Sequence, residues 1–460
     1  MSGLLDSLTS ASSALNAQRM GMDVVGQNIA NVNTPGYSRR QLVLAEIPAT
    51  DPSSAGRGAE VVSVQGLRDP IVADRLRSEQ QAQSFSDAQV QSLSTLQTAV
   101  GLPGSGLDAT LSSFFDAFST LASDVTSPNS RAAVVSAGQS LASGFNNLSN
   151  QIAAARQDAD STIRADIDQV NTLAQQVASY NGQIRTTAAG SAAVESLKDS
   201  RDVALTQLAQ LVGVTVNEQT DGSVDVALSS GQSLVVGDTA FAVSATSAPP
   251  SGYAAISVQG TDVTSQLTQG EVGGLLQVRD TTLSGYATQL DQLAYDVATQ
   301  VNAIHATGYD ASGNPAGNFF VAPTAVAGAA QALAVAPTVA ANPQLVAGSG
   351  TGASGDNQIA SAIANLRNVR AMSGGTATAA EAWAQIVYNV GAGVSSAQAD
   401  SQTHAQIVQQ LQQLRDSTSG VSLDEEAAWL MKYQSAYQAS ARYFTTVDTA
   451  LDTLMQMVVL

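Results

Sequence analysis

Residues 4–38 read LLDSLTSASSALNAQRMGMDVVGQNIANVNTPGYS, and their periodicity predicts how the chain begins to fold. Two rows of positions repeat every seven residues: Leu8, Leu15, Met22 and Ile29 in one row, and Leu4, Ala11, Gln18 and Val25 in the other. Because the rows alternate four and three residues apart, they predict a coiled-coil helix. This helix would be about 39 Å long at ~1.5 Å per residue. The remaining positions are mainly Ser, Asn, Gln and Ala, so we expect other faces of the helix to contact protein too.

The end of this predicted helix is marked by a turn signature. Asn31 and Asn33 tolerate the left-handed backbone at the end of a helix, and Pro35-Gly36 fits the central pair of a type II turn. We expect Asn31, Asn33, Pro35 and Gly36 to set the path of the chain out of the helix. Alternation in 41–47 then predicts a strand. Between them, the pair Arg39-Arg40 has two interpretations: it binds the acidic surface of a neighbouring molecule, or it is solvated after the turn.

A second apolar helix is predicted at the other end of the chain. Ser422 and Glu425 have the spacing of a capping box, and Asp424 to Glu426 place negative charge in the first turn, where the helix dipole favours it. An apolar stripe follows at helical spacing: Leu430, Tyr437, Ala441, Phe444, Leu451, Leu454 and Val458. The two terminal helices could form a pair within one chain, or could also contact neighbouring copies. The low charge and the apolar last residues favour assembly.

The composition excludes several classes of function. The 460 residues carry 19 Lys+Arg and 38 Asp+Glu, a net charge of −19, which disfavours binding to nucleic acid. The absence of Cys excludes disulfides, thiolate catalysis and Cys-ligated metals. We find no secretory signal peptide and no apolar stretch long enough for membrane insertion.

Between its ends, the chain predicts helices interrupted by one β insertion. Apolar residues recur at helical spacing in 68–100, 107–121, 148–184, 202–211, 271–305, 357–372 and 382–414. At 213–261 the period changes to two, with Thr220-Asp221-Gly222 as a hairpin turn. We therefore expect a mainly α fold with paired N- and C-terminal coiled-coil helices, a helical-bundle domain and a small antiparallel β domain. The predicted domains are 1–60 with 401–460, 61–212 with 262–400, and 213–261. An alternative placement packs 309–350 against the last of these.

The sequence contains no convincing chemical site, so we predict no catalytic residue, no cofactor and no metal. Asp424 to Glu426 are consecutive on a helix and point in different directions. The loop from Asp310 to Asn314 has Pro315 where a calcium loop requires Gly. The glycine-rich run from Gly348 to Gly352 has no Lys for a phosphate.

The terminal motifs resemble those of a known family. Ala30 to Ser38, extended to Asn28 and Arg39, is similar to the N-terminal signature of bacterial flagellar rod, hook and hook-associated axial proteins. Gly420 to Glu426 and Tyr433 to Arg442 resemble the C-terminal helix of the hook-associated members. Asp199 to Asp202 and Val301 to His305 give weaker support.

The resemblance implies a structural, non-enzymatic protein of the flagellum that self-assembles at the hook–filament junction. The implied partners are a ring of its own copies, the hook protein, a second hook–filament junction protein and a flagellar export chaperone. It also implies an extracellular location, reached by type III export without signal cleavage. The alternatives are a hook or rod protein, a secreted helical adhesin, or an enzyme that travels with the flagellum.

Overall fold

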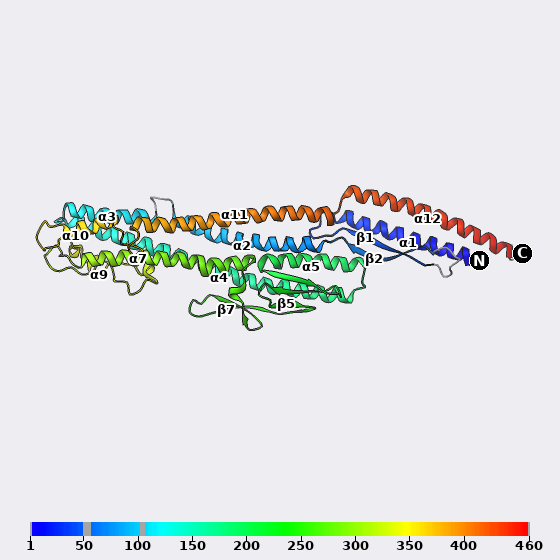
Figure 1. Cartoon of the computed structure of the whole chain (residues 1–460), viewed down its shortest axis with the longest axis horizontal. Coiled ribbons are helices and arrows are strands. Elements are labelled where there is room, and N and C mark those ends of the chain that lie inside the picture. Colours follow the sequence, from blue (N-terminus) through cyan, green and yellow to red (C-terminus); the bar gives the residue numbers. More distant parts are fainter. Residues whose placement is uncertain (1, 49–56, 102–105, 459–460) are drawn as a thin grey trace.

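The structure is a computed structural model, and it describes residues 2–48, 57–101 and 106–458. The molecule is a long rod with both chain ends at the same end (Figure 1). Most of its residues are helical. Two small antiparallel sheets lie beside the middle of the rod, and a third lies beside α1 near the terminal end (Figure 1). The predicted mainly α fold with a β insertion is confirmed.

Eight long helices run along the rod. Six form the body: α2 (Pro70–Val100), α3 (Leu107–Ser123), α4 (Pro128–Thr186), α5 (Ala192–Leu211), α7 (Leu283–His305) and α11 (Ala379–Ser419). The other two, α1 (Ser2–Ala30) and α12 (Leu423–Val458), extend beyond them (Figure 1). The 59 residues of α4 span about 88 Å at ~1.5 Å per residue. The chain leaves the terminal end along α2, and α11 returns it there, so α12 lies beside α1 (Figure 1).

Three small sheets and several short helices complete the fold. The sheets are β1 (Arg40–Glu46) with β2 (Ala59–Gly66), then β3 (Val214–Glu218), β4 (Val224–Leu228), β5 (Ser233–Val236) and β6 (Thr239–Ala240), and finally β7 (Val243–Ser247), β8 (Ala254–Val258) and β9 (Thr261–Asp262). The short helices are η1 (Thr264–Gln266), α6 (Gly270–Leu276), the π-helical η2 (Gln277–Thr282), α8 (Ala329–Ala332), α9 (Pro337–Ala341), η3 (Pro343–Leu345), α10 (Gln358–Asn365) and η4 (Leu366–Asn368).

Local sequence explains where several helices begin. Asp69 caps α2 by accepting hydrogen bonds from the backbone of Ile71 and Val72, and Pro70 occupies the first turn, where no donor is needed. Ser127 and Pro128 do the same for α4. The helices therefore start where the sequence supplies a side-chain acceptor followed by proline.

Two hydrophobic cores lie one after the other along α4. The first, called the distal core because it lies at the end of the rod opposite the chain ends (Figure 1), joins the first half of α4 to α3, α7, α10 and α11. It is centred on Phe114, Phe118 and Phe319. The second core joins the last half of α4 to α5, α6 and the sheets around Ile163, Leu208 and Leu234. Among the described residues, neither core includes a residue of α1 or α12. The terminal pair is thus outside the packed body.

His305 fixes the loops at the distal end. Its ring is fully buried, its Nδ1 lies 2.7 Å from the carbonyl oxygen of Gly317, and its Nε2 accepts a hydrogen bond from the backbone of Ala347 at 2.8 Å. Burial lowers the pKa of His305 to about 4, so the ring is neutral at physiological pH. His305 at the end of α7 thus bridges two loops of the distal end.

Several predicted boundaries differ from the structure. The helix predicted from Leu148 begins at Pro128, and strand β2 was not predicted. The helix predicted to reach Met372 ends as η4 at Asn368. Residues 309–350 do not pack with the β insertion, because Phe319, Phe320 and Val346 belong to the distal core. The boundary drawn between 400 and 401 falls inside the continuous helix α11.

No helix in the described ranges is both long and apolar enough to cross a membrane.

Candidate functional site

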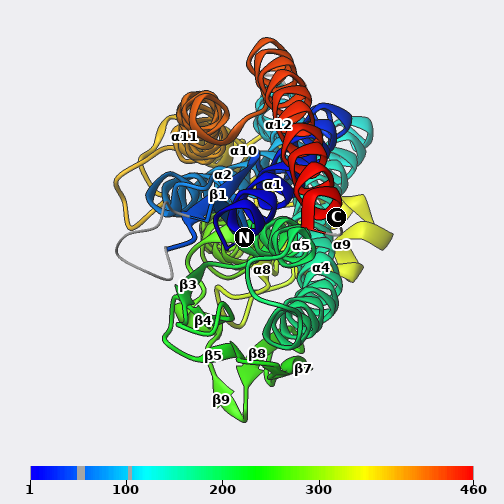
Figure 2. The ribbon, with the colours of Figure 1, turned by 90° about the vertical axis from the view of Figure 1, so that its right-hand side faces the viewer.

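The terminal helices α1 and α12 form an antiparallel pair that projects from the body (Figures 1 and 2). Gly21 lies against the ring of Tyr433, since a Cβ atom on Gly21 would fall 2.5 Å from Tyr433 Cε1. Asn28 Nδ2 donates a hydrogen bond to Glu426 Oε2 at 3.0 Å. The two contacts are seven residues apart on each helix and run in opposite order. The residue numbers of two positions that face each other across the pair therefore add up to about 454.

The members of both predicted rows on α1 are buried or half-buried along the whole helix. Ala11 and Val25 are buried, and Leu4, Leu8, Leu15, Met22 and Ile29 are half-buried. A neighbouring row of buried residues was missed: Ala17, Gly21, Val24 and Asn28. Their spacing of four, three and four is a usable signal, but they are mostly small or polar, so hydrophobicity alone did not reveal them.

The predicted stripe on α12 is divided between the pair and solvent. Leu430, Ala441, Phe444 and Leu451 are half-buried, whereas Tyr437 and Leu454 are each 37% exposed. The side chain of Val458 lies outside the described residues. The stripe thus serves the intramolecular pair in part and leaves apolar groups uncovered.

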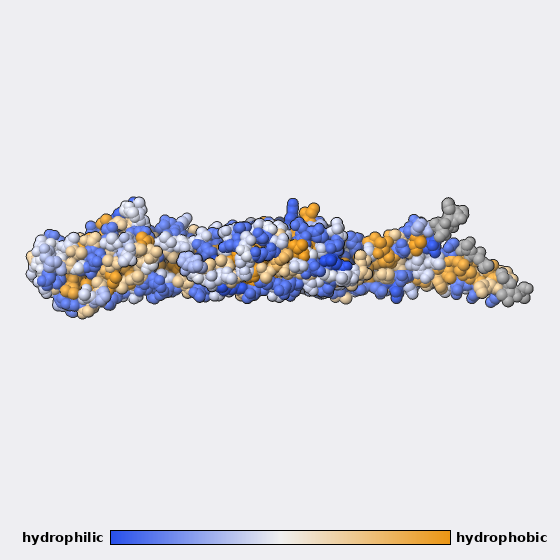
Figure 3. All heavy atoms as spheres, turned by 90° about the horizontal axis from the view of Figure 1, so that it is seen from below, coloured by the Kyte–Doolittle hydropathy of each residue, from blue (hydrophilic) through white to orange (hydrophobic). Residues whose placement is uncertain are grey.

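A large share of the exposed apolar surface lies on α12. Eight of the 17 large apolar side chains that are exposed among the described residues belong to this helix: Leu423, Trp429, Met431, Tyr437, Tyr443, Leu454, Met455 and Met457. Hydrophobic patches are visible along the terminal end of the rod (Figure 3). Trp429 is 40% exposed, its ring contacts that of Tyr433, and the ammonium group of Lys432 lies over the Trp429 ring. Such a concentration marks an interaction surface.

The signature turn has the predicted type II geometry at Pro35-Gly36, but Asn31 and Asn33 do not have the left-handed backbone that we expected at the end of the helix. The backbone of Tyr37 donates a hydrogen bond to the carbonyl oxygen of Thr34 at 3.2 Å, and Gly36 has a φ of +81°, as a type II turn with Pro35 and Gly36 at its centre requires. Asn31 donates to the carbonyl oxygen of Gln27 and accepts from Thr34, which closes the end of α1. Asn33 is exposed. Gly36 packs directly against Val203 of α5, so the turn rests on the body.

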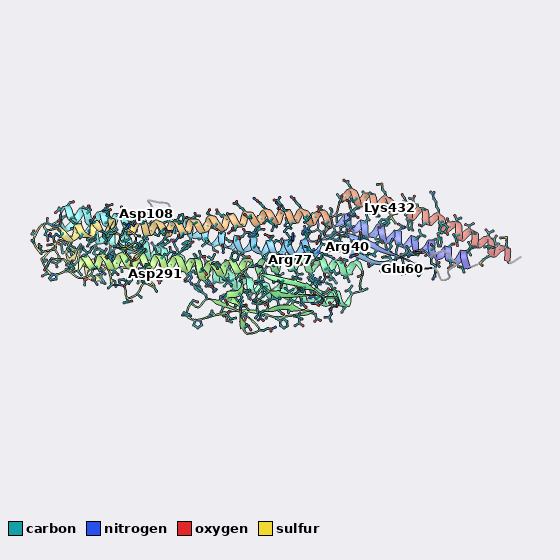
Figure 4. The ribbon with its side chains drawn as sticks, viewed as in Figure 1. Arg40, Glu60, Arg77, Asp108, Asp291 and Lys432 are labelled. Carbon is teal, nitrogen blue, oxygen red and sulfur yellow. The ribbon has the colours of Figure 1, made fainter. Side chains whose placement is uncertain are left out.

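The interpretation of Arg39-Arg40 as a solvated pair is wrong, because each arginine forms ion pairs within its own chain. Arg39 Nε binds Glu426 Oε1 at 2.7 Å, and its Nη1 binds Glu425 Oε2 at 2.6 Å. The carboxylate of Glu425, which we expected to cap its helix with Ser422, is thus engaged by Arg39. Arg40, which is labelled in Figure 4, is buried. Its Nη2 lies 3.0 Å from Oδ2 of Asp199, a residue of α5.

A third arginine extends this network into the body. Arg68 binds Asp199 Oδ1 at 2.6 Å and also Glu195. Burial raises the pKa of Glu195, but the hydrogen bond and charge of Arg68 outweigh it, so the pKa stays below its usual value. We call Asn28, Arg39, Arg40, Arg68, Glu195, Asp199 and Glu426 the joint network. It connects α1 and α12 to α5 where the pair leaves the body.

Surface hollows surround the joint. One of about 670 Å³ lies between the signature turn and α5, and one of about 340 Å³ lies on the other side of the turn beside α2 and the end of α11. A third of about 270 Å³ lies between α1, β1 and the start of α12. Among the described residues, no group of three or more His, Asp or Glu is placed to hold a metal ion.

Comparisons with known proteins agree with this arrangement. Residues 93–320 match the family model of the flagellar hook-associated protein FlgK helical domain. Residues 8–37 match that of the flagella basal body rod protein, and 402–457 match that of the C-terminal region of flagellar basal body rod FlgEFG proteins. These two terminal matches cover most of α1, the turn and most of α12.

Relatives match over nearly the whole chain. The chain is 27% identical to flagellar hook-associated protein 1 of Salmonella typhimurium, over 97% of this chain and 99% of that one. It is 26% identical to the protein of the same name from Bacillus subtilis, over 97% and 96% of the two chains. The solved structure of the flagellar hook junction protein FlgK from Burkholderia pseudomallei has a TM-score of 0.67 at 20% identity, covering 75% of this chain and 100% of that one.

The fold and the terminal matches define a flagellar axial protein, in which the two chain ends form one helical pair. Within that class, the match to the helical domain separates the chain from rod and hook proteins. The chain is similar to flagellar hook-associated protein 1 over nearly its whole length, and nearly half of it matches the model of the FlgK helical domain. The chain is a structural component of the flagellum, and the adhesin alternative is not supported.

Proposed function

We propose that the chain forms a ring of copies at the junction between hook and filament and joins the two without enzymatic activity. Its relatives are named for association with the hook. The observation that carries the proposal is the exposed apolar surface of α12, which belongs to a helix pair outside both cores. Covering such surface stabilises an assembly by about 25 cal/mol per Å².

The low charge of the terminal pair supports close contact between copies. From Tyr433 to Val458, α12 carries three charged residues, Arg442, Asp448 and Asp452. A helix that stays in solvent normally has more charge on its outer face. The small Ser, Ala and Thr side chains on this face also allow a neighbouring helix to approach closely.

The net charge is carried by the body. Residues 78–400 have nine Lys+Arg and 25 Asp+Glu, a net charge of −16, whereas the remaining residues have ten and 13, a net charge of −3. Like charges repel when copies pack together, and a charged outer surface maintains solubility. We propose that 1–66 and 420–460 form the assembly domain, that 67–212 and 262–419 form the surrounding helical domain, and that 213–261 form the outward β domain.

Within the assembly domain, we propose that the rows on α1 and the stripe on α12 act together. Their inward members hold the pair, and the outward members, such as Tyr437 and Leu454, contact the next copy. The proposed neighbours along the axis are the hook protein and a second hook–filament junction protein. Before assembly, an export chaperone would cover the same apolar surface, and export would proceed without signal cleavage.

Deleting the gene tests this function. We expect cells with complete hooks and no attached filaments in electron micrographs, and recovery of filaments when the full chain is supplied. An antibody to the chain should label the tip of the hook. Normal filaments in the deletion strain would contradict the proposal.

A further inference from the structure

The α1–α12 pair has a repeating surface that does not by itself fix one register. On α12, Leu430, Tyr437, Phe444 and Leu451 are seven residues apart, and the α1 residues opposite the first three, Val24, Ala17 and Ser10, are also seven apart. Sliding one helix past the other by seven residues therefore places uncharged small or apolar groups face to face again. Coiled coils with this kind of repeat need a specific feature to select one register.

Asn28 is such a feature, because its side chain is fully satisfied in one position. It is 1% exposed, and its Nδ2 donates to the carbonyl oxygen of Arg40 at 2.9 Å and to Glu426 at 3.0 Å. Its Oδ1 accepts from the backbone of Arg40 at 3.0 Å and from the Tyr37 hydroxyl at 2.8 Å. Two donors and two acceptor sites are the whole capacity of an amide side chain.

Glu426 is equally specific on the opposite helix. It is 1% exposed, and its two oxygens are used by Asn28 and Arg39. The contact of Gly21 with Tyr433, one heptad away, adds a steric constraint because only glycine leaves room for the ring. The hydrogen bond between Asn28 and Glu426 and the contact between Gly21 and Tyr433 both require the same register.

A slip of one heptad breaks both pairs. In one direction Asn28 would face Tyr433, and in the other Glu426 would face Gly21. Either slip leaves a buried amide or carboxylate without its partner, which is costly in a low-dielectric environment. The uncharged residues that face each other tolerate the slip, but the Asn28–Glu426 pair does not.

We infer that Asn28, paired with Glu426, is the positioning residue that sets the register of the terminal helices and thereby the height at which α12 presents its exposed face to the next copy. The inference rests on the proposed assembly function for its consequence. A slip of seven residues moves that face by about 10 Å along the axis at ~1.5 Å per residue. Copies with different registers would not match each other in one ring.

The absence of cysteine in the chain allows a direct test by spin labelling. Asn16→Cys on α1 and Asp452→Cys on α12 are both at exposed positions. Residue 452 lies 14 residues beyond the point that faces Asn16, so the labels are about 21 Å apart along the axis. Double electron–electron resonance on the full chain should give one narrow distance.

In this labelled chain, Asn28→Leu should retain its helices by circular dichroism and add a second distance that corresponds to an axial shift of about 10 Å. Glu426→Leu, which removes the other half of the pair, should do the same. Gln18→Leu is the matched control, because it makes a half-buried polar member of the same helix apolar outside the joint; it should keep one distance.

One unchanged distance in both variants would overturn the inference, as would a broad distribution in the parent chain or loss of the helices in both variants. A register effect is thereby distinguished from a general loss of stability. Incorporation of the parent chain at hook tips is scored separately, so failure of the proposed function would not be confused with failure of the inference.

Discussion

At the scale of single residues, the joint depends on two adjacent arginines with different partners. Successive side chains on an extended strand point to opposite sides. Arg40 begins β1 and binds Asp199 of the body, whereas Arg39 precedes it and binds Glu425 and Glu426 of α12. The sequence revealed the arginines but not these partners, because they lie far away along the chain. The period of apolar residues predicts which face of a helix or strand is buried. It does not predict which charged residue, far away in the sequence, forms an ion pair with that element.

A second residue-scale feature is the buried carboxyl group of Asp166 on α4. Burial, followed by the negative charge of Glu271, raises its pKa to about 7. Its Oδ2 has no hydrogen-bond partner among the described residues. Because the pKa is higher in the folded than in the unfolded chain, the contribution of this group to stability is full below pH 3.8 and is lost as the pH rises through 7.

Asp166→Asn should therefore stabilise the protein increasingly from pH 4 to pH 8. The full effect above pH 7 is at most about 4 kcal/mol, at ~1.4 kcal/mol per pKa unit. Thermal unfolding of the variant and the parent at each pH measures the difference. Asp168→Asn, at an exposed position two residues later on the same helix, is the control and should show no such trend. A constant difference between Asp166→Asn and parent across this range would contradict the assignment.

At the scale of elements, the helices of the body and the β insertion were largely predictable, because each shows its own period in the sequence. The pairing of α1 with α12 was left open as one of two possibilities, and the structure has the pair within one chain. The start of α4 was missed although Leu141 and Phe145 have helical spacing. The strand β2 was missed because a register shift separates Val61 from Val64 and breaks the period of two. The contact surface was harder to predict because Gly21 and Asn28 are not apolar.

Arg39→Ala tests how α12 is anchored. It leaves the buried carboxylate of Glu426 without its cation, which should cost about 3–5 kcal/mol. Hydrogen–deuterium exchange should accelerate in the first turns of α12 and stay unchanged in α4. Arg370→Ala is the matched control, since the pair Arg370–Glu381 is exposed and should contribute about 1 kcal/mol or less. Equal effects of the two substitutions would show that the joint does not anchor the helix.

At the scale of the whole molecule, a charged body with two internal cores carries a terminal pair that belongs to neither core. The body buries its large apolar side chains within its own cores, as Phe114, Phe118 and Phe319 show. The terminal pair leaves large apolar side chains in solvent, among them Trp429, Tyr443 and Met455. The sequence indicated this asymmetry through its low terminal charge, but the exposed residues could be identified only once the orientation of α12 toward α1 was known.

The central claim is that neighbouring copies cover the outward face of α12. Tyr443→Cys places a single thiol on that face, and Asp238→Cys places one on the β insertion as a control. We expect a maleimide dye to label both variants as purified chains, but to label only Asp238→Cys on intact flagella. Equal labelling of Tyr443→Cys in the purified chain and in flagella that contain it would contradict the account.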